Sequence, residues 1–483
     1  MFIDFESSGD LPFEPDICIV GAGIAGLTLV SALRGLKILV LEGGGLTHEP
    51  QSQSLFESEI DFAGALNIGA VDGRFRVFGG SGTQWSGALI PMAPYEMTGW
   101  PIDNDMLAPY FDQLDTMLQL RGSRFDQGGD IRVAKILPAH RRDLGRIFRK
   151  SLIRDPNVVV LYHANVVEVV GNYPDLVTGI RVRSLTGRHQ IFPVRTLVIA
   201  AGAIETVRLL LVSRSLRPDR WKHLGCGFND HIVLHAGEVI AVNHARLRRM
   251  FRGFYIGGVL HVPRFQPSIP GYALVFFEAA PDSAFVKFRE GTFCPSLDLV
   301  AGVLARCVAL KPISRRSTPV VHLVAEQPSR SESRIRLAGE LDALGMPRIR
   351  LEWRIGEEEQ RTLTTVGRAL ESILMRRQIG TVMWSREAFH PKEGARLDHA
   401  VDQYHHAGGA RMGEVVNADC RVQGMQNLYL ASAAVFPSGG CSNPAFTIMA
   451  LALRLAEHLR RQPKRGADSQ TRPVVVHPST LIR

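Results

Sequence analysis

The chain has 483 residues, 45% of them hydrophobic and 21% charged, which is typical of a globular protein long enough for two or more domains. The net charge of +9 is spread over short basic clusters without an aromatic-interleaved basic motif, so we expect no nucleic-acid partner. No stretch reaches about 18 uninterrupted apolar residues, so we expect no membrane span.

The six cysteines favour free thiols in a reducing compartment. They form no CxxC or Cys/His metal spacing, and Cys18 falls inside an apolar run, so we expect neither a metal site nor a disulfide framework. The first residues are acidic and lack the basic and apolar regions of a secretory signal. We therefore expect a cytoplasmic protein, and the sequence leaves its oligomeric state open.

A dinucleotide-binding fingerprint opens the chain. The apolar run Ile17–Val20 predicts a buried strand, and it leads into a GAGIAG turn and an apolar helix. Gly21 would permit the tight turn, Gly23 the approach of a pyrophosphate to the backbone, and Gly26 close packing of helix on strand. A second strand ends on Glu42, at the distance where an acid accepts ribose hydroxyls. A glycine turn that serves packing alone is the alternative, but it does not account for the acid.

The order of predicted strands and helices along the chain indicates an α/β fold in which one discontinuous domain carries an insert. Residues 1–100, 145–235 and 395–462 read as a Rossmann-like, FAD-type cofactor domain, and residues 236–394 read as an inserted antiparallel-sheet substrate domain. Residues 463–483 contain prolines without periodicity and read as a flexible tail. The predicted elements that support this division are strands over 158–170, 196–200, 273–277, 320–325 and 348–353, and helices over 202–211, 357–374 and 445–459.

Two C-terminal motifs indicate chemistry. One pairs His405 and His406 with a glycine turn and ends at Gly413; the other places Asn443 directly before Pro444. Each has a structural alternative. The histidines could both be structural residues of a turn, and Asn followed by Pro is a good helix start, with Asn as the N-cap.

At these motifs the chain resembles the glucose–methanol–choline (GMC) flavoprotein oxidoreductases. GAGIAG with Glu42 is similar to that family's FAD motif, GGSGTQW at 79–85 to its flavin-contacting loop, AAGAIETVRLLLVS to its internal strand and helix, and the two C-terminal motifs to its active site. The resemblance implies that His405 faces the flavin and acts on the substrate hydroxyl. It places Asn443 at the partner position, as in pyranose-oxidase-like members.

The resemblance also implies a set of FAD contacts. Some members carry a histidine just before the tryptophan of the flavin loop and bond it covalently to the flavin; here that residue is Gln84, so we expect non-covalent FAD. The implied cofactor-binding residues are Gly21, Gly23, Ile24, Ala25, Gly26, Glu42, Gly43, Gly79, Gly80, Ser81, Thr83, Gln84, Trp85, Val167, Ala201, Gly202, Ala433, Asn443, Pro444 and Ala445.

The function implied is FAD-dependent oxidation of an alcohol group (a CH–OH donor) on a sugar-like or polyhydroxylated small molecule. His405, with an ordinary pKa near 6.5, would be the base, and Asn443 would hold the substrate oxygen while hydride passes to flavin N5. The partners are then an alcohol or sugar substrate and an electron acceptor, oxygen or another. The alternatives are a GMC-type lyase and an FAD-bound scaffold, in both of which the flavin is structural. A nicotinamide enzyme is disfavoured because no second dinucleotide fingerprint appears.

Overall fold

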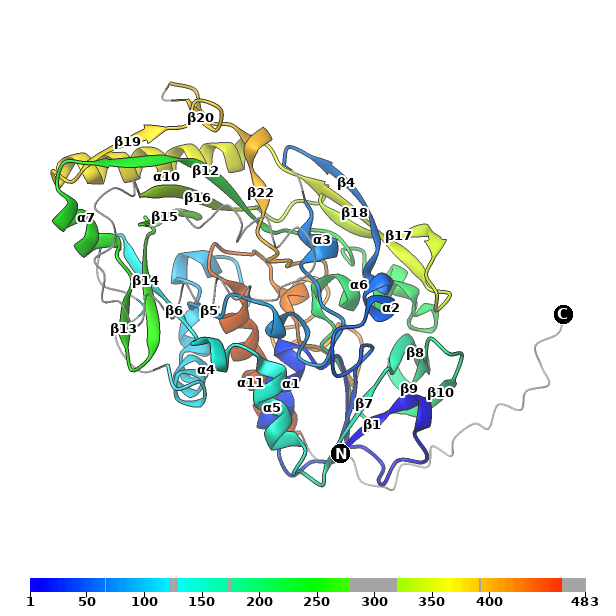
Figure 1. Cartoon of the computed structure of the whole chain (residues 1–483). Helices are drawn as coiled ribbons and strands as arrows, with labels where there is room; N and C mark the ends of the chain where they lie inside the picture. The colour runs from blue at the N-terminus through cyan, green and yellow to red at the C-terminus, as the bar shows by residue number, and fades with distance from the viewer. Residues whose placement is uncertain are drawn as a thin grey trace.

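The computed structural model describes residues 1–65, 67–120, 125, 129–172, 175–277, 319–390 and 392–462 (Figure 1). The predicted tail at 463–483 lies outside the described residues. No helix of the described segments is long and apolar enough to cross a membrane.

A parallel sheet forms the centre of the cofactor-binding part. Within the described chain it has six strands, in the order β1 (Phe2–Asp4), β7 (Val158–Tyr162), β3 (Ile38–Leu41), β2 (Ile17–Val20), β11 (Leu197–Ile199) and β23 (Leu428–Leu430). Every neighbouring pair is parallel. Both faces are covered, which explains why β2, β3 and β11 are apolar throughout instead of alternating.

The two faces of this sheet contribute to different cores. Alternate residues such as Ile19 and Val40 pack with α1 (Ile24–Ala32), α5 (Leu144–Leu152) and α11 (Pro444–Arg461). Their neighbours along the strands join the larger core, which includes α6 (Gly202–Val212). Figure 1 shows α1, α5 and α11 close together, to the left of β1 and β7. Strands from three separated parts of the chain thus build one sheet, and the predicted discontinuous Rossmann-like fold is confirmed.

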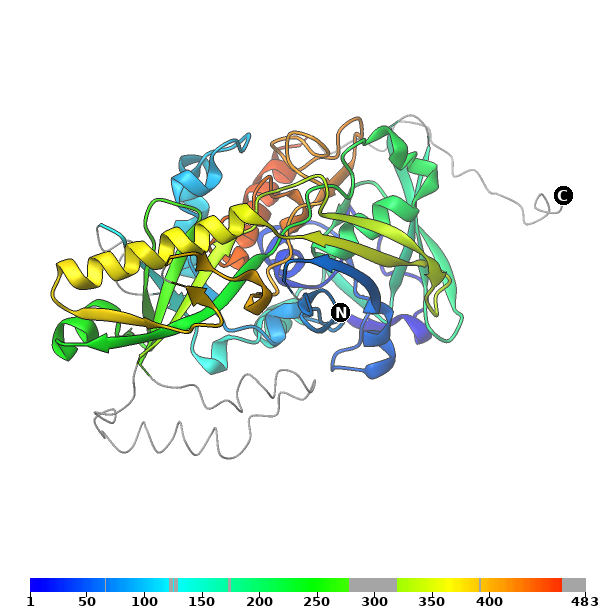
Figure 2. The ribbon, with the colours of Figure 1, turned by 90° about the horizontal axis from the view of Figure 1, so that it is seen from above.

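The second large sheet is antiparallel, and α10 (Glu357–Arg376) lies across one face of it (Figure 2). In the described residues it has nine strands. Their order is β19 (Gly380–Trp384), β12 (His231–Ala241), β16 (Val320–Glu326), β15 (Gly271–Phe276), β14 (Val259–Phe265), β6 (Ile131–Ile136) and β5 (Ala88–Leu89), with β13 (Phe254–Ile256) beside β14 and β22 (Val401–Asp402) beside β12.

The antiparallel sheet includes strands from outside the predicted insert. β5 and β6 come from residues 88–136, and β22 follows the insert. Membership in this sheet therefore does not define a domain boundary, and the substrate domain at 236–394 remains a prediction. The predicted helix at 357–374 is α10, and the strands predicted over 158–170 are the two separate strands β7 and β8. The division falls at His163, whose φ of 55° cannot belong to a continuous strand.

Smaller elements complete the described fold. The remaining strands are β10 (His189–Pro193), β9 (Leu176–Arg183) and β8 (Asn165–Asn172) in one sheet, β17 (Arg334–Leu341), β18 (Pro347–Arg354) and β4 (Ser58–Ala63) in another, and β20 (Phe389–His390) with β21 (Gly394–Ala395). The remaining helices are α2 (Pro50–Gln53), α3 (Gly69–Asp72), α4 (Asn104–Met117) and α7 (His244–Phe251).

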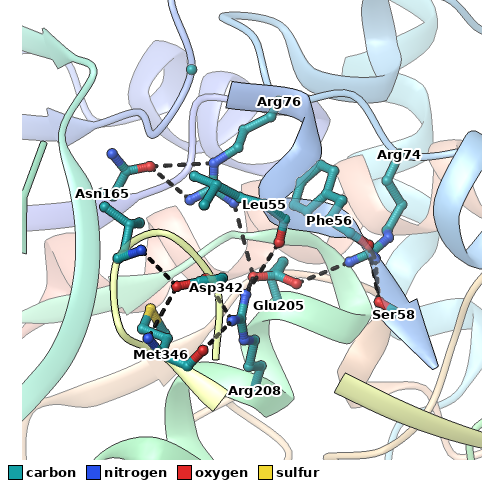
Figure 3. A network of polar contacts seen from close by, with 12 residues as sticks. Leu55, Phe56, Ser58, Arg74, Arg76, Asn165, Glu205, Arg208, Asp342 and Met346 are labelled. Atoms are coloured by element: carbon teal, nitrogen blue, oxygen red, sulfur yellow. Dashed lines mark hydrogen bonds and ion pairs between the residues drawn. The ribbon is translucent and has the colours of Figure 1, made fainter. Parts of the chain in front are cut away.

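A buried ion network connects α6 to the β17–β18 hairpin and to the segment before the second glycine loop (Figure 3). Glu205 of α6 binds Arg74 (2.9 Å) and Arg208 (3.3 Å). Arg208 also binds Asp342 of the hairpin (2.7 Å), and the side chains of that pair are 3% and 1% exposed. Arg76 reaches Asn165 of β8 (2.8 Å). Because each charge has a partner, the network holds three parts of the chain in one arrangement.

Candidate active site

The first glycine loop has the geometry that the fingerprint predicts. Gly21 has a φ of 99°, and a Cβ there would lie 2.6 Å from the Ala200 carbonyl oxygen at the end of β11. A Cβ on Gly26 would lie 2.1 Å from the Gly21 carbonyl oxygen, so this glycine allows α1 to pack on the turn. A Cβ on Gly23 would meet no atom within 4 Å, so the space in front of Gly23 is open to a ligand.

The second glycine loop lies against the first. Gly79 N donates to Ala22 O (2.9 Å), and a Cβ on Gly80 would lie 3.0 Å from Gly23 Cα. Both Gly79 and Gly80 have positive φ, at 102° and 53°, which only glycine adopts readily. The loop continues as a short 3-10 helix, Gly80–Thr83, to Gln84 and to Trp85, whose Nε1 donates to Arg142 O (2.7 Å).

Glu42 binds backbone in this structure. Its Oε2 accepts from Ala22 N and its Oε1 from Gly44 N, both at 2.9 Å. Burial raises the pKa of Glu42, and these two amides oppose that shift. The carboxylate therefore connects the first glycine loop to the loop after β3, a structural role that the sequence did not indicate. Each oxygen keeps a lone pair that could accept a ribose hydroxyl.

The other predicted cofactor contacts fall in several places. Ala201 and Gly202 follow β11 beside the first glycine loop, and Gly202 has a φ of 77°. Gly43 is approached by the Arg76 guanidinium, since a Cβ there would lie 2.7 Å from Nη2. Val167 of β8 packs in a small apolar cluster with Leu55, Leu344 and Met346. The remaining predicted contacts Ile24, Ala25, Ser81, Thr83, Ala433, Pro444 and Ala445 lie in α1, the second glycine loop, the segment after β23 and the start of α11.

The loop that carries His405 is bonded on two sides. Gly408 N donates to Ala433 O, and Ala410 N donates to Ala434 O, both at 2.9 Å, which attaches the loop to the segment after β23. On the other side Asn229 and Ala407 exchange backbone hydrogen bonds of 2.9 Å. The two C-terminal motifs and the start of β12 therefore meet at one place.

His405 and Asn443 form a pair. Asn443 Nδ2 lies 3.3 Å from His405 Nε2, and both residues are partly exposed. Asn443 does occupy the N-cap position of α11, with Pro444 at the first helical position, but its side chain makes no capping hydrogen bond. Asn443 is thus an N-cap by its backbone position, as the structural alternative predicts, but its side-chain amide does not cap the helix and is available to the site.

His405 also contacts two residues for which the sequence predicted no role, on the side opposite Asn443. Its Nδ1 lies 3.0 Å from His231 Nδ1, and its backbone N donates to Asp230 Oδ1 (2.9 Å). Asp230 and His231 stand 174–175 residues before His405 in the chain. The available signal was a polar Asn-Asp-His run at the entrance to a buried strand.

Burial changes the acid–base properties of these groups. It lowers the pKa of His405 well below the usual 6.5, with smaller effects of the same sign from His231, His406 and Arg264. The pKa of His231 falls to about 4 and that of His406 to about 3, also mainly by burial. All three imidazoles are therefore neutral at pH 7. We no longer expect His405 to titrate near neutrality, as its ordinary pKa of 6.5 had predicted.

A cluster of polar side chains lies next to this pair and consists of Asp230, Asp402 and His406. One carboxylate oxygen or ring nitrogen from each residue lies within 4.8 Å of the other two. Asp402 accepts from Ile68 N and Gly69 N, both at 2.9 Å. Burial raises the pKa of Asp402 to about 6 and that of Asp230 well above its usual value. This polar cluster fixes the backbone around His405.

The residues present fit a dinucleotide cofactor. Two glycine loops lie against each other, the space before Gly23 is open, and α1 begins there with its unpaired amides. The fold and this site define the class: a protein with a Rossmann-like domain whose glycine loops suit a dinucleotide cofactor.

Comparison with known proteins shows which proteins the chain is similar to. Residues 329–452, which include His405 and Asn443, match the family described as GMC oxidoreductase. Paromamine 6'-oxidase of Streptomyces fradiae is 26% identical over 324 residues, which cover 65% of this chain and 54% of that protein. C-glycoside 3-oxidase of Microbacterium trichothecenolyticum is 25% identical over 426 residues, covering 79% and 74%. The match thus spans about half the length of the first relative.

Solved structures share the fold. Pyridoxine 4-oxidase from Mesorbium loti has a TM-score of 0.59 at 15% identity, covering 93% of this chain and 100% of that one. A formate oxidase of Aspergillus oryzae RIB40, studied for FAD modification, has a TM-score of 0.56 at 14% identity, covering 92% and 98%. The resemblance predicted from the motifs is confirmed: residues 329–452 match the GMC oxidoreductases, and the chain shares its fold with these two oxidases of known structure.

Proposed function

We propose that this protein is an FAD-dependent oxidoreductase that oxidises a CH–OH group of a sugar-like or polyhydroxylated small molecule. The observation that carries the proposal is the His405–Asn443 pair, 3.3 Å apart, within the segment that matches the GMC oxidoreductases. The two relatives named above are oxidases, and their names specify paromamine and a C-glycoside as substrates, which supports the sugar-like class.

The chemistry assigns a task to each side chain. FAD, when bound, supplies the hydride acceptor. His405 is neutral, so its Nε2 can take the hydroxyl proton of the substrate. Asn443 donates from Nδ2 toward that nitrogen and can donate to the substrate oxygen in its place, which would hold the reacting carbon in position. The glycine loops and Glu42 would hold the dinucleotide.

We further propose that the FAD is non-covalent, because Gln84 stands where a covalent link would need a histidine. Acid precipitation should leave the yellow colour in the supernatant, and colour retained in the pellet would contradict this point.

The deciding experiment is anaerobic mixing of the purified protein with a panel of sugars, polyols and simple alcohols. Loss of the oxidised flavin absorbance with at least one of them is expected. A protein that keeps its flavin oxidised with the whole panel, while it cleaves a hydroxynitrile or does nothing, would move the lyase or the scaffold alternative ahead. Readmission of oxygen or addition of a quinone would then identify the acceptor.

A further inference from the structure

His231 lies between the two loops that carry the proposed catalytic pair. Its Nδ1 lies 3.0 Å from His405 Nδ1, and its Nε2 lies 3.5 Å from the carbonyl oxygen of Gly439, four residues before Asn443. The residue is 1% exposed and begins β12, so the sheet fixes its backbone. Its contacts therefore join a rigid strand to both parts of the site.

The hydrogen-bond partners define where each proton sits. An amide nitrogen donates and does not accept, so Asn443 Nδ2 requires a lone pair on His405 Nε2. A carbonyl oxygen only accepts, so Gly439 O requires the proton of His231 to be on Nε2. His231 Nδ1 is then a lone pair, and it can accept the proton that neutral His405 carries on Nδ1.

Resting on the proposed function, we infer that His231 is the positioning residue of this site: by accepting Nδ1–H of His405, it keeps the Nε2 lone pair of His405 turned toward Asn443 and the substrate hydroxyl. The inference follows from the order Asn443, His405, His231, Gly439, in which each group has one possible role.

Asp230 completes the arrangement through the backbone. Its Oδ1 accepts from His231 N (2.6 Å) and from His405 N (2.9 Å), so one oxygen atom holds the backbone of both histidines. Burial keeps His231 neutral, and the nearby charges of Glu96 and Arg264 act on it in opposite directions. A neutral His231 can accept, whereas an imidazolium could not.

The inference is tested first on the resting holoenzyme, without substrate. In protein labelled with ¹⁵N-histidine, the resonances missing from His405→Gln identify His405. We expect Nδ1 of His405 to be protonated and Nε2 to be unprotonated at pH 7. A wild-type His405 protonated on Nε2 would overturn the inference. This result does not depend on whether any alcohol reduces the flavin, so the proposed function can fail while the inference stands.

Two variants then test the consequence. His231→Asn places an acceptor oxygen near the position of Nδ1, and His231→Leu removes the acceptor. We expect His231→Leu to slow flavin reduction roughly 10–100-fold with FAD content and KM nearly unchanged, and to move the His405 proton to Nε2; His231→Asn should restore most of the rate. His235→Leu, at an exposed position on the same strand, is the control and should change neither reading. Equal losses in His231→Asn and His231→Leu with an unchanged His405 tautomer would show that the residue is only structural.

Discussion

In His405, Nδ1 contacts His231 inside the protein and Nε2 faces Asn443, so Nε2 is the nitrogen that a substrate could reach. We predict that His405→Ala slows anaerobic flavin reduction by substrate on the order of 10²–10⁴-fold, the usual contribution of a positioned general base. FAD content should be unchanged, because in the proposed mechanism the imidazole takes a proton and does not hold the dinucleotide.

His399→Ala is the matched control, since that histidine lies on the surface of the same segment. Rapid-scan absorbance gives the rate, and the ratio of flavin to protein absorbance gives the FAD content. Because burial lowers the pKa of His405 well below its usual 6.5, the wild-type rate should not change through the neutral range and should fall only in acid. A near wild-type rate in His405→Ala would remove the proposed base.

Asn443 provides a second residue-level prediction. Asn443→Ala should slow flavin reduction roughly 10–10³-fold, because it removes one donor to the reacting oxygen. Replacing an N-cap usually costs about 1 kcal/mol, but this side chain makes no capping bond, so the unfolding free energy should change by less than that. Urea unfolding of both proteins tests this point, and a loss of about 2 kcal/mol would show that the amide caps α11 after all.

At the scale of elements, the two glycines of the first loop separate folding from cofactor binding. A Cβ on Gly23 meets nothing, whereas a Cβ on Gly26 meets the Gly21 carbonyl oxygen at 2.1 Å. We predict that Gly23→Ala folds with wild-type stability as apoprotein yet loses FAD, and that Gly26→Ala loses both stability and FAD. Gly339→Ala, whose Cβ also meets nothing within 4 Å, is the control.

The measurements are FAD content after purification and the melting temperature of the FAD-stripped proteins. A fully loaded Gly23→Ala would mean that the open space before this glycine does not receive the cofactor.

Local signals explain what the sequence could predict. The fingerprint from Ile17 to Glu42 and the Asn-Pro start of α11 each lie within one short segment of the chain, and the structure has the predicted elements there. The approach of His231 to His405 joins residues 174 positions apart, and a single sequence carries no record of such contacts. β6 enters the antiparallel sheet in the same way, through long-range pairing with β14, and β5 pairs with β6.

At the scale of the whole molecule, the buried ion network connects elements that no short segment could hold together. Removing one partner of a buried pair leaves an uncompensated charge, which typically costs about 3–5 kcal/mol. We predict a loss of this size for Arg208→Met, which keeps the apolar stem but leaves Asp342 unpaired. Arg361→Met is the control, because the Arg361–Glu357 pair is 76% and 89% exposed and should cost less than about 1 kcal/mol. Urea unfolding compares the two, and equal losses would contradict the assigned role.

His163 connects the N-terminal strand to the loop after β3 and gives the molecule a pH-dependent contact. Its Nδ1 lies 3.0 Å from Asp4 Oδ1 and its Nε2 lies 3.0 Å from Glu49 Oε1, so both nitrogens donate only when the ring is protonated. Partial burial acts to lower the pKa of His163, but the hydrogen bonds to Glu49 and Asp4 outweigh it and raise the pKa above 6.5.

The sign of the effect follows from this raised pKa. Below pH 6.5 the ring is protonated in the folded and the unfolded chain, and the contact contributes fully to stability. Above pH 6.5 the unfolded chain loses its proton first, and the contribution disappears as the pH rises through the folded pKa. We therefore predict that the difference in unfolding free energy between wild type and His163→Gln is largest below pH 6.5 and shrinks toward alkaline pH. His189→Gln, at an exposed site on β10, should show no such trend, and a wild-type advantage that grows with pH would contradict the assignment.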